Sequence, residues 1–417
     1  MIGSGAAYDV ATDATRAAVQ GPPPGRAGAG LGVCIYQRYL PPDASGAGKQ
    51  AVTLAKALRR RGVNVVLLGD ANSRSALPSS LDGVPVRWVR TRERGYYALV
   101  VYWLRIALQL LRLQRRFDVL HIHSAAFDQA GAILIARVLG KRVLVRSSLQ
   151  GEFAGLSKSR SGRLHRRWLQ FCQRFVVLSR ELAAEFAAAE LPLDRLECIS
   201  NGVDTSLFHP VEQPAKQRLR EELALPLHAR IVVFHGVFIE RKRLCWLVEH
   251  LGPVLKERNL VLLLVGGAAR DEPETGYAQR LTEIIARSPA RERILIRPAT
   301  PEVHRYLQAA DLYILASNAE GMPNALLEAM ASGLVPIVNR SSGANDVVRD
   351  GENGLFFDVG NPPTLHSALE RCHADRDLAR LSEGALARIG ERFDIAVVAD
   401  RFVAMYESMA SRTVRRA

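Results

Sequence analysis

The sequence predicts an α/β protein with two parallel-sheet domains. Short apolar runs bounded by turn residues alternate with longer segments of helical period, and this alternation is typical of β–α–β units. The runs fall into two sets on either side of a turn-rich junction, Asn201-Gly202-Val203-Asp204. A chain of 417 residues is also long enough for about two to three domains. We therefore place a hinge near residue 205.

The first set of runs predicts a Rossmann-like N-terminal domain over residues 31–205. Its strands are expected at 32–36, 64–69, 119–123, 142–146 and 175–179. Segments of helical period, such as 50–61 and 131–139, separate these strands. Residues 1–30 are rich in Gly, Ala and Pro and lack the apolar core of a secretory signal, so we expect a disordered N-terminal tail.

The second set predicts a Rossmann-like C-terminal domain over residues 206–395. Its strands are expected at 230–235, 260–266, 294–297, 312–316 and 335–339. Helical spacing returns beyond Phe393, so residues 396–417 are expected to form a closing helix with a basic tail at 412–416.

The composition excludes several classes of protein. With 48% hydrophobic and 24% charged residues the chain resembles an ordinary globular protein, and disordered, collagen-like and polytopic membrane proteins are excluded. The formal net charge of +14 favours anionic partners. The five cysteines form no CxxC pair, so we expect neither a disulfide framework nor a zinc site, and a reducing cytoplasm fits best.

A basic segment at 158–167, followed by Trp168, has three interpretations: a solvated helix face, a contact for an anionic substrate, or a contact for an anionic membrane surface. No nucleic-acid-binding motif accompanies it, so nucleic acid is not an expected partner. The longest apolar stretch, 96–113, contains Arg105 and Arg112, which disfavour a membrane span, and we interpret it as a core-facing helix. We expect a cytoplasmic protein, with peripheral attachment to the inner face of the plasma membrane as an alternative.

Three patterns resemble known ligand sites but lack an essential feature. Gly28-x-Gly30-x-Gly32 precedes the first strand, whereas a dinucleotide loop follows it. The segment 46–50 lacks the first glycine and the magnesium-binding hydroxyl of a P-loop. Asp375-Arg376-Asp377 lies in a charged helical stretch typical of a solvated surface, so we expect no metal site.

The segment 317–333 carries the strongest chemical signal. Glu320 follows the strand at 312–316, and open parallel sheets bind their ligands at the carboxyl ends of strands. Gly321 and Pro323 predict a turn, after which a helix begins near Asn324. The amides at a helix N-terminus can bind phosphate without a metal, and Glu328 lies one turn into this helix.

This segment resembles the EX7E motif of the retaining glycosyltransferases of family 4, with Glu320 and Glu328 as the paired acids. The resemblance continues through 333–338, 342–348 and 350–355 and covers residues from about 31 to 410. It implies the GT-B fold, in which two Rossmann-like domains face each other across a cleft and a C-terminal helix crosses back to the N-terminal domain. The N-terminal domain would bind the acceptor and the C-terminal domain the nucleotide sugar.

The resemblance also implies an activity. The protein would transfer a hexosyl group from a nucleotide-diphosphate sugar, with UDP- and GDP-sugars expected, to a glycan or lipid-linked acceptor. Cell-surface polysaccharide or glycolipid biosynthesis would be the pathway, and neither a metal nor another cofactor would be needed.

Individual residues take roles from the same resemblance. Lys242 matches the diphosphate-binding lysine, and Arg241 would assist it. Glu320 would contact the donor sugar, and Glu328 would hold the ribose hydroxyls. The backbone of the turn and of the helix start would meet the sugar and the diphosphate through Gly321, Met322, Pro323, Asn324, Ala325 and Leu326. Gly46, in the first β–α loop, would let the backbone approach donor phosphate or acceptor.

Two positions depart from the family pattern. Val237 stands where the family often carries an arginine, so Arg241 would have to compensate. Gln150 stands near the place of the family's N-terminal-domain histidine. These departures motivate the alternative of a non-catalytic partner protein with the same fold. A same-fold epimerase or phosphorylase is the other alternative.

Overall fold

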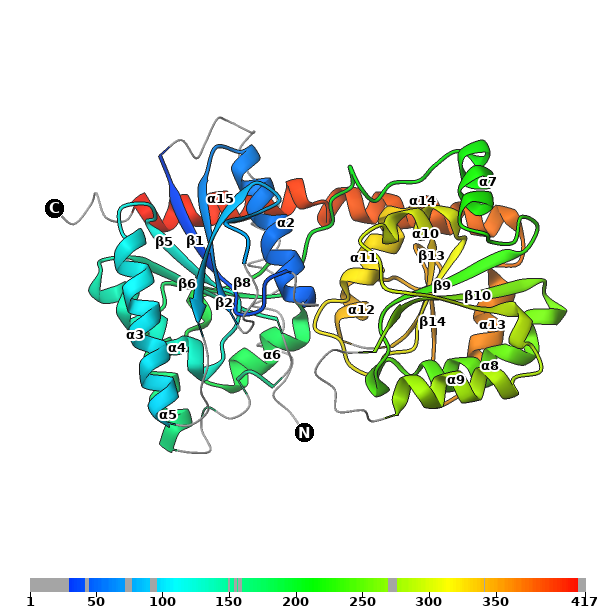
Figure 1. Ribbon diagram of the computed structural model, residues 1–417, viewed down its shortest axis with the longest axis horizontal. Helices are drawn as coiled ribbons and strands as arrows, with labels where there is room; N and C mark the ends of the chain where they lie inside the picture. Colours follow the sequence, from blue (N-terminus) through cyan, green and yellow to red (C-terminus); the bar gives the residue numbers. More distant parts are fainter. Residues whose placement is uncertain are drawn as a thin grey trace.

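The computed structural model describes residues 30–41, 45–71, 77–90, 96–148, 151–153, 156, 160–268, 276–340 and 342–411. These residues form two lobes that lie side by side, each with a central sheet flanked by helices (Figure 1). The expected N-terminal tail, apart from Gly30, and the basic tail at 412–416 lie outside the described residues.

The N-terminal sheet has its strands in the order β3-β4-β2-β1-β5-β6-β7-β8. They are β1 (Gly32–Tyr36), β2 (Asn64–Ala71), β3 (Ser80–Leu81), β4 (Val84–Arg90), β5 (Val119–Ile122), β6 (Arg142–Ser147), β7 (Arg174–Val177) and β8 (Leu196–Cys198). Neighbouring strands are parallel except for β3 and β4. The predicted strands are confirmed as β1, β2, β5, β6 and β7. All five residues of β1 are buried, as expected for a strand covered by helices on both faces.

The C-terminal sheet is parallel throughout its described strands, in the order β11-β10-β9-β12-β13-β14. They are β9 (Arg230–Val237), β10 (Leu260–Gly267), β11 (Ile294–Arg297), β12 (Leu312–Leu315), β13 (Val335–Asn339) and β14 (Leu355–Phe357). The five predicted strands are confirmed as β9 to β13. The two domains therefore have the alternating parallel architecture that the apolar runs predict.

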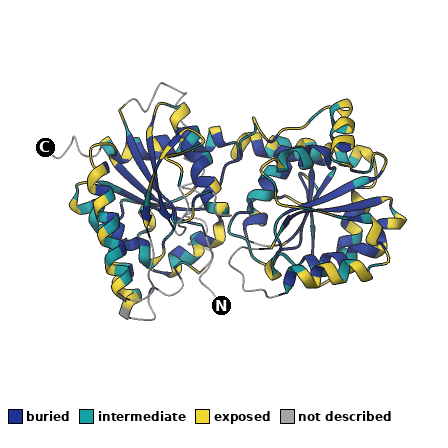
Figure 2. Ribbon diagram, viewed as in Figure 1, coloured by how far each residue is buried: buried dark blue, intermediate teal, exposed yellow. Residues whose placement is uncertain are grey.

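Helices cover both sheets (Figure 2). In the N-terminal domain they are α2 (Gly46–Arg60), α3 (Tyr96–Leu113), α4 (Phe127–Val138), α5 (Arg160–Leu169) and α6 (Arg180–Ala188). In the C-terminal domain they are α7 (Gln213–Glu222), α8 (Leu244–Glu257), α9 (Tyr277–Arg287), α10 (Val303–Ala309), α11 (Asn324–Ala331), α12 (Ser342–Val347), α13 (Pro363–Arg371) and α14 (Asp375–Arg392). Within the described ranges, none of these helices has the length and apolar character needed to cross a bilayer.

The start of α2 explains why 46–50 looks like a phosphate loop. Ser45 caps the helix, because its Oγ accepts a hydrogen bond from the Gly48 amide at 3.2 Å. A Cβ at Gly48 would lie only 2.1 Å from the carbonyl oxygen of Tyr39, so this glycine is required for close packing. The loop therefore presents Gly46 at the carboxyl edge of the sheet without forming a P-loop.

The last helix, α15 (Ile395–Ser411), returns to the N-terminal domain and packs beside α2, as expected (Figure 1). Its Phe402 and Tyr406 are fully buried, and the Tyr406 hydroxyl lies 2.7 Å from Nδ1 of His121 in β5. Just before the helix, Val203 of the junction exchanges backbone hydrogen bonds with Phe393 and Ile395 at 2.8 and 2.9 Å. The junction and the closing helix are therefore held together.

Candidate active site

The site is assembled from the carboxyl ends of the central strands of the C-terminal sheet. Glu320 lies in the loop after β12. Lys242 is the last residue of a short 3-10 turn, Glu240–Lys242, that follows β9. Because β9 and β12 are neighbours, their loops meet at the same sheet edge. The Lys242 Nζ lies 2.5 Å from Oε1 of Glu320, and Nη1 of Arg241 lies 2.7 Å from the same oxygen. Three residues that the family resemblance nominated, Glu320, Lys242 and Arg241, are thus brought together.

Burial and charge act against each other in this cluster. Burial raises the pKa of Glu320, but Lys242 and Arg241 outweigh it, so the pKa lies below its usual value and the carboxylate stays ionised. Burial lowers the pKa of Lys242, and the carboxylate of Glu320 partly offsets that effect. Two cations around one carboxylate leave one net positive charge, which favours an anionic ligand.

Glu328 borders the same region from α11. Its Oε2 lies 3.1 Å from Nε2 of His235 near the end of β9. Tyr313 of β12 feels both acids: its pKa is raised well above its usual value by burial and then by Glu320 and Glu328. The Tyr313 hydroxyl is buried and makes no hydrogen bond within the described part of the chain. His235 and Tyr313 were not predicted from the sequence, because single polar residues in apolar strands are usually part of the core.

The turn before α11 is held by its neighbours. The Gly343 amide donates a hydrogen bond to the Glu320 carbonyl oxygen at 3.0 Å. A Cβ at Gly343 would come within 2.5 Å of the Gly321 carbonyl oxygen, so only glycine allows this approach. The side chains of Met322 and Leu326 are buried, which leaves the backbone of this segment as the part that a ligand can meet.

Asn324 connects the two domains at the first position of α11. Its Nδ2 donates to the carbonyl oxygen of Gly46 at 3.1 Å, and its Oδ1 accepts from Nδ2 of Asn201 at 2.6 Å. Asn201 in turn accepts from Nη2 of Arg146, at the end of β6, at 2.5 Å. The structure therefore places Gly46 beside the helix start, across the boundary between the domains. The predicted members Pro323 and Ala325 flank Asn324 in the same segment.

The two departures from the family pattern have different outcomes. Val237 ends β9 and supplies no cation, and Arg241 contacts Glu320 as a second positive group. Gln150 lies outside the described residues. Two positions further along the chain, Glu152 accepts a hydrogen bond from Oγ of Ser124 at 2.7 Å, and burial raises its pKa. Glu152 lies at the carboxyl edge of the N-terminal sheet and was not predicted from the sequence.

A second polar cluster lies at the same edge of the N-terminal sheet. Arg38 contacts Asp70 at 3.0 Å and also pairs with Asp128. The Tyr102 hydroxyl donates to Asp70 at 2.9 Å and contacts the Tyr36 hydroxyl. Burial, the largest influence, raises the pKa of Asp70 to about 7. These residues come from the ends of β1 and β2 and from the helices α3 and α4, so no single segment of the sequence displays the cluster.

Metal ligands are not grouped in the described ranges. No set of three or more His, Cys, Asp or Glu side chains there is placed to hold a metal ion. Asp375 lies on the surface and pairs with Arg230.

Comparison with known proteins yields two family matches, one for each domain. Residues 44–207 match the model of Glycosyltransferase Family 4, and residues 229–375 match Glycosyl transferases group 1. Together the two matches span most of the chain.

Two similar proteins illustrate the range of relatives. One is UDP-Gal:alpha-D-GlcNAc-diphosphoundecaprenol alpha-1,3-galactosyltransferase of Escherichia coli, 26% identical over 73% of this chain and 79% of the relative. The other is N-acetyl-alpha-D-glucosaminyl L-malate synthase of Bacillus anthracis, 23% identical over 91% of this chain and 96% of the relative.

Solved structures show the same fold. HepE of Anabaena, in complex with UDP and glucose, superimposes with a TM-score of 0.76 at 18% identity over 91% of this chain and all of that one. Sucrose-phosphate synthase of Thermosynechococcus elongatus gives a TM-score of 0.75 at 17% identity over 92% of this chain and all of that one. The expected GT-B architecture, with two facing parallel-sheet domains, is confirmed.

Proposed function

Since this chain belongs to glycosyltransferase family 4, we propose that it moves a hexosyl group, with retention of configuration, from a nucleotide-diphosphate sugar to a glycan or lipid-linked acceptor. The observation that carries this proposal is the cluster of Lys242, Arg241 and Glu320 beside the N-terminus of α11. It supplies positive charge and backbone amides at one sheet edge, which suits a diphosphate.

The relatives support a uridine nucleotide as the first donor to test. The Escherichia coli relative is named for UDP-galactose, and the HepE structure contains UDP. The same relative is named for an undecaprenol-linked acceptor, which supports a role in polysaccharide or glycolipid assembly. A GDP-sugar is the alternative donor in this proposal.

Each site residue has a role in the proposed reaction. Lys242 and Arg241 offset the negative charge that builds on the departing diphosphate as the bond from the sugar C1 to the phosphate oxygen breaks. Glu320 orients the sugar, Glu328 holds the ribose hydroxyls, and the backbone from Gly321 to Leu326 meets the diphosphate.

Retention of configuration follows in this proposal from attack on a single face. The acceptor oxygen bonds to C1 on the side from which the diphosphate leaves, and a diphosphate oxygen takes the acceptor proton. The step then needs no nucleophile from the protein and no metal ion. Positioning and charge stabilisation are the protein's contributions.

The carboxyl edge of the N-terminal sheet supports an acceptor rich in hydroxyl groups. Buried polar atoms there, Oε1 of Gln37, Nε2 of His123 and Oε1 of Gln129, have no hydrogen-bond partner within the described residues. Buried polar groups are ordinarily satisfied, and hydroxyl groups both donate and accept. Glu152 at this edge, which accepts hydrogen bonds from Ser124 and from the Ser148 amide, is the acidic group that we assign to an acceptor hydroxyl in this proposal.

Thermal denaturation tests the donor site directly. The wild type and Glu328→Ala are heated with UDP, GDP, ADP and their sugars, with and without EDTA. A ligand at about 100 times its Kd adds roughly 2.7 kcal/mol, which raises Tm by several degrees. We expect one nucleotide to raise Tm in EDTA and to lose its effect in Glu328→Ala. If none raises Tm, the non-catalytic alternative gains support.

Product analysis separates the enzymatic alternatives. A retaining transferase releases the nucleoside diphosphate and forms a glycoside with the anomeric configuration of the donor, which NMR of the product can establish. An epimerase would return an altered sugar without an acceptor, and a phosphorylase would require inorganic phosphate. Either of these outcomes would contradict the proposed transfer.

A further inference from the structure

Helix α3 has apolar side chains on two opposite faces. Its inner face places Tyr102, Ile106 and Leu110 in the core, each no more than 6% exposed. Its outer face carries four aliphatic side chains, which we call the α3 stripe: Val100, Leu104, Leu108 and Leu111, exposed by 39, 65, 46 and 45%. Their spacing of four, four and three residues puts them on one side of the helix.

This outer face is unusual for a helix that covers a sheet. Such a helix ordinarily has polar residues on the side facing solvent. Of the thirteen large hydrophobic residues exposed in the described chain, five lie on α3, namely the stripe and Tyr97. A concentrated apolar patch on a charged protein marks an interaction surface rather than a random exposure.

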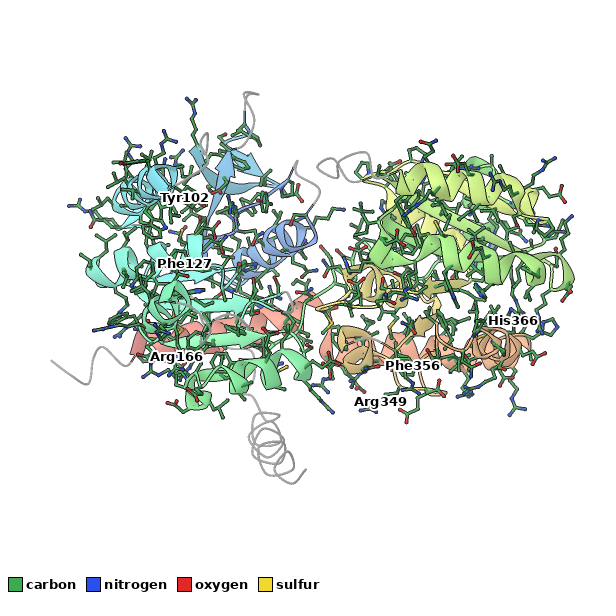
Figure 3. All side chains as sticks on the ribbon, turned by 90° about the horizontal axis from the view of Figure 1, so that it is seen from below. Tyr102, Phe127, Arg166, Arg349, Phe356 and His366 are labelled. Carbon is green, nitrogen blue, oxygen red and sulfur yellow. The ribbon has the colours of Figure 1, made fainter. Side chains whose placement is uncertain are left out.

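The neighbouring helices extend the same side of the domain. Helix α3 packs beside α4, and α4 packs beside α5. Figure 3 shows Tyr102, Phe127 and Arg166 of these three helices one after another across the N-terminal lobe. Helices α4 and α5 add the exposed side chains of Val138 and Leu164.

Trp168, which the sequence suggested as a membrane contact, packs between helices instead. The Trp168 ring stacks on Phe127 with centroids 5.5 Å apart and meets the edge of Trp103 at 5.3 Å. Trp168 therefore packs α3, α4 and α5 against one another, and the exposed apolar side chains on this side of the domain include the leucines of the α3 stripe.

The charge around the stripe is predominantly positive. Helices α3, α4 and α5 and the segment 114–118 after α3 contain nine arginines and two acidic residues: Asp118, which accepts a hydrogen bond from the Gly32 amide, and Asp128, which pairs with Arg38. The exposed arginines of this set are Arg112, Arg115, Arg116, Arg163 and Arg167. A second copy of the chain would bring equal positive charge against this face, whereas anionic headgroups would neutralise it.

We propose that the α3 stripe, with the arginines around it, docks the protein on an anionic lipid bilayer. Leucines lying in a plane with arginines beside them are the composition of an interfacial helix, whose apolar face enters the headgroup boundary while its cations meet lipid phosphates. The leucines insert into the apolar part of the headgroup boundary, and the arginines favour membranes with negatively charged lipids.

Docking in this way would place the N-terminal sheet edge near the lipid. Tyr102 of α3 contacts Asp70 and Tyr36 at the carboxyl edge, so α3 begins beside the proposed acceptor region. A lipid-linked acceptor would then reach the site from the bilayer. This last step rests on the proposed function, whereas the docking surface does not.

Vesicle sedimentation of the full-length protein tests the surface. Phosphatidylcholine vesicles with and without phosphatidylglycerol are compared at low and high salt. We expect the wild type to bind the anionic vesicles, and Leu104→Glu/Leu108→Glu to lose about tenfold or more in partition coefficient. Arg112→Gln/Arg115→Gln/Arg116→Gln should bind more weakly and with a smaller salt dependence.

A matched control lies in the C-terminal domain. Leu227 and Ile296 are 42 and 39% exposed, so Leu227→Glu/Ile296→Glu changes similar surface at another place and should bind as the wild type does. The proposal would be overturned if the wild type stayed in solution with anionic vesicles, or if the control variant lost as much binding as Leu104→Glu/Leu108→Glu. It would also be overturned if the wild type were a dimer that Leu104→Glu/Leu108→Glu dissociates.

The same preparations separate this proposal from the proposed function. Leu104→Glu/Leu108→Glu should keep the wild-type Tm and its rise with nucleotide, because neither side chain lies in the core or at the donor site. Vesicle binding without any effect of nucleotide on Tm would contradict the donor site and leave the docking surface supported.

Discussion

Lys242 and Glu320 are 78 positions apart in the chain, yet the Lys242 ammonium lies 2.5 Å from the Glu320 carboxylate at the edge of the C-terminal sheet. Their strands, β9 and β12, are neighbours because the doubly wound sheet brings the first strand of the domain beside the fourth. Arg241 joins the pair, so the carboxylate is shared by two cations. A donor diphosphate would compete with Glu320 for both cations, which couples donor binding to the orientation of the acid.

Replacing Lys242 by alanine should slow turnover. The variant loses the better buried of the two cations, and loss of one charge-stabilising donor costs about 2.7 to 4 kcal/mol, so kcat should fall roughly 100- to 1,000-fold. Steady-state release of nucleoside diphosphate measures the effect. Lys256→Ala, which removes an exposed lysine paired with Glu292, is the control and should leave kcat unchanged. A normal rate in Lys242→Ala would remove Lys242 from the mechanism.

Replacing Glu328 by glutamine should weaken nucleotide binding more than turnover. An amide keeps the shape of the side chain but loses charge-assisted hydrogen bonds to ribose hydroxyls, each worth about 1.5 to 3 kcal/mol, so Kd should rise roughly 10- to 100-fold. Calorimetric titration with UDP measures it. Glu352→Gln alters an exposed glutamate paired with Arg349 and serves as control. An unchanged Kd in Glu328→Gln would place the ribose elsewhere.

The fold was largely readable from the sequence because most strands are buried on both faces. Strands such as β1 and β12 are therefore continuous apolar runs, which periodicity detects. The prediction missed β4, in which Pro85, Arg87 and Arg90 interrupt the buried valines, and it missed the short strands β3, β8 and β14. A proline and two arginines within seven residues resemble a surface loop when the pairing partner is unknown, and strands of two or three residues are too short for periodicity to detect.

The donor side of the site, in the C-terminal domain, could be predicted from the sequence further than the acceptor side, in the N-terminal domain. Glu320 and Glu328 lie in one continuous motif, so sequence alone could nominate them. The cluster of Arg38, Asp70 and Asp128 combines two strand ends with the first turn of α4, which are far apart in the chain, and only the fold brings them together. The outer face of α3 escaped detection because apolar residues occupy two opposite sides of 96–113 and Arg105, Gln109 and Arg112 take only one strip, so periodicity cannot tell which apolar side is core and which is surface.

Removing the Asn324 side chain should loosen the contact between the domains. Asn324→Ala removes the hydrogen bonds to Gly46 and Asn201, each worth about 1 kcal/mol. Amide hydrogen exchange should therefore speed up near residues 46–50 and 324–327, while β10 keeps its protection. Gln279→Ala removes an exposed amide from α9 and should alter neither segment. Unchanged exchange in Asn324→Ala would show that other contacts hold the domains.

Gly46→Ala probes the same contact by adding bulk. A Cβ at this position would lie 3.3 Å from Nδ2 of Asn324, tighter than ordinary contact, so the asparagine amide must shift by a few tenths of an ångström. We expect faster exchange in the same two segments, but less than in Asn324→Ala. An effect larger than that of Asn324→Ala would mean that the glycine backbone itself is needed there.

Asp70 should make folding depend on pH. Its pKa is raised to about 7 in the folded protein, whereas an unfolded aspartate titrates near 3.9, so the folded state binds the proton more tightly. Its favourable contribution is fully present below about pH 4 and is lost as pH rises through about 7, a change of about 3 to 4 kcal/mol. Urea unfolding at pH 5 and pH 8 measures this slope.

The test of that slope is a comparison of two asparagine variants. Asp70→Asn lacks the titrating group, so its stability should fall less between pH 5 and pH 8 than that of the wild type, even if the new amide packs poorly against Arg38 and lowers stability at both values. Asp82→Asn changes an exposed aspartate paired with Lys56 and should retain the wild-type slope. If Asp70→Asn also retains it, the proton must be bound elsewhere, and Asp70 is held ionised by Arg38 and Tyr102 throughout this range.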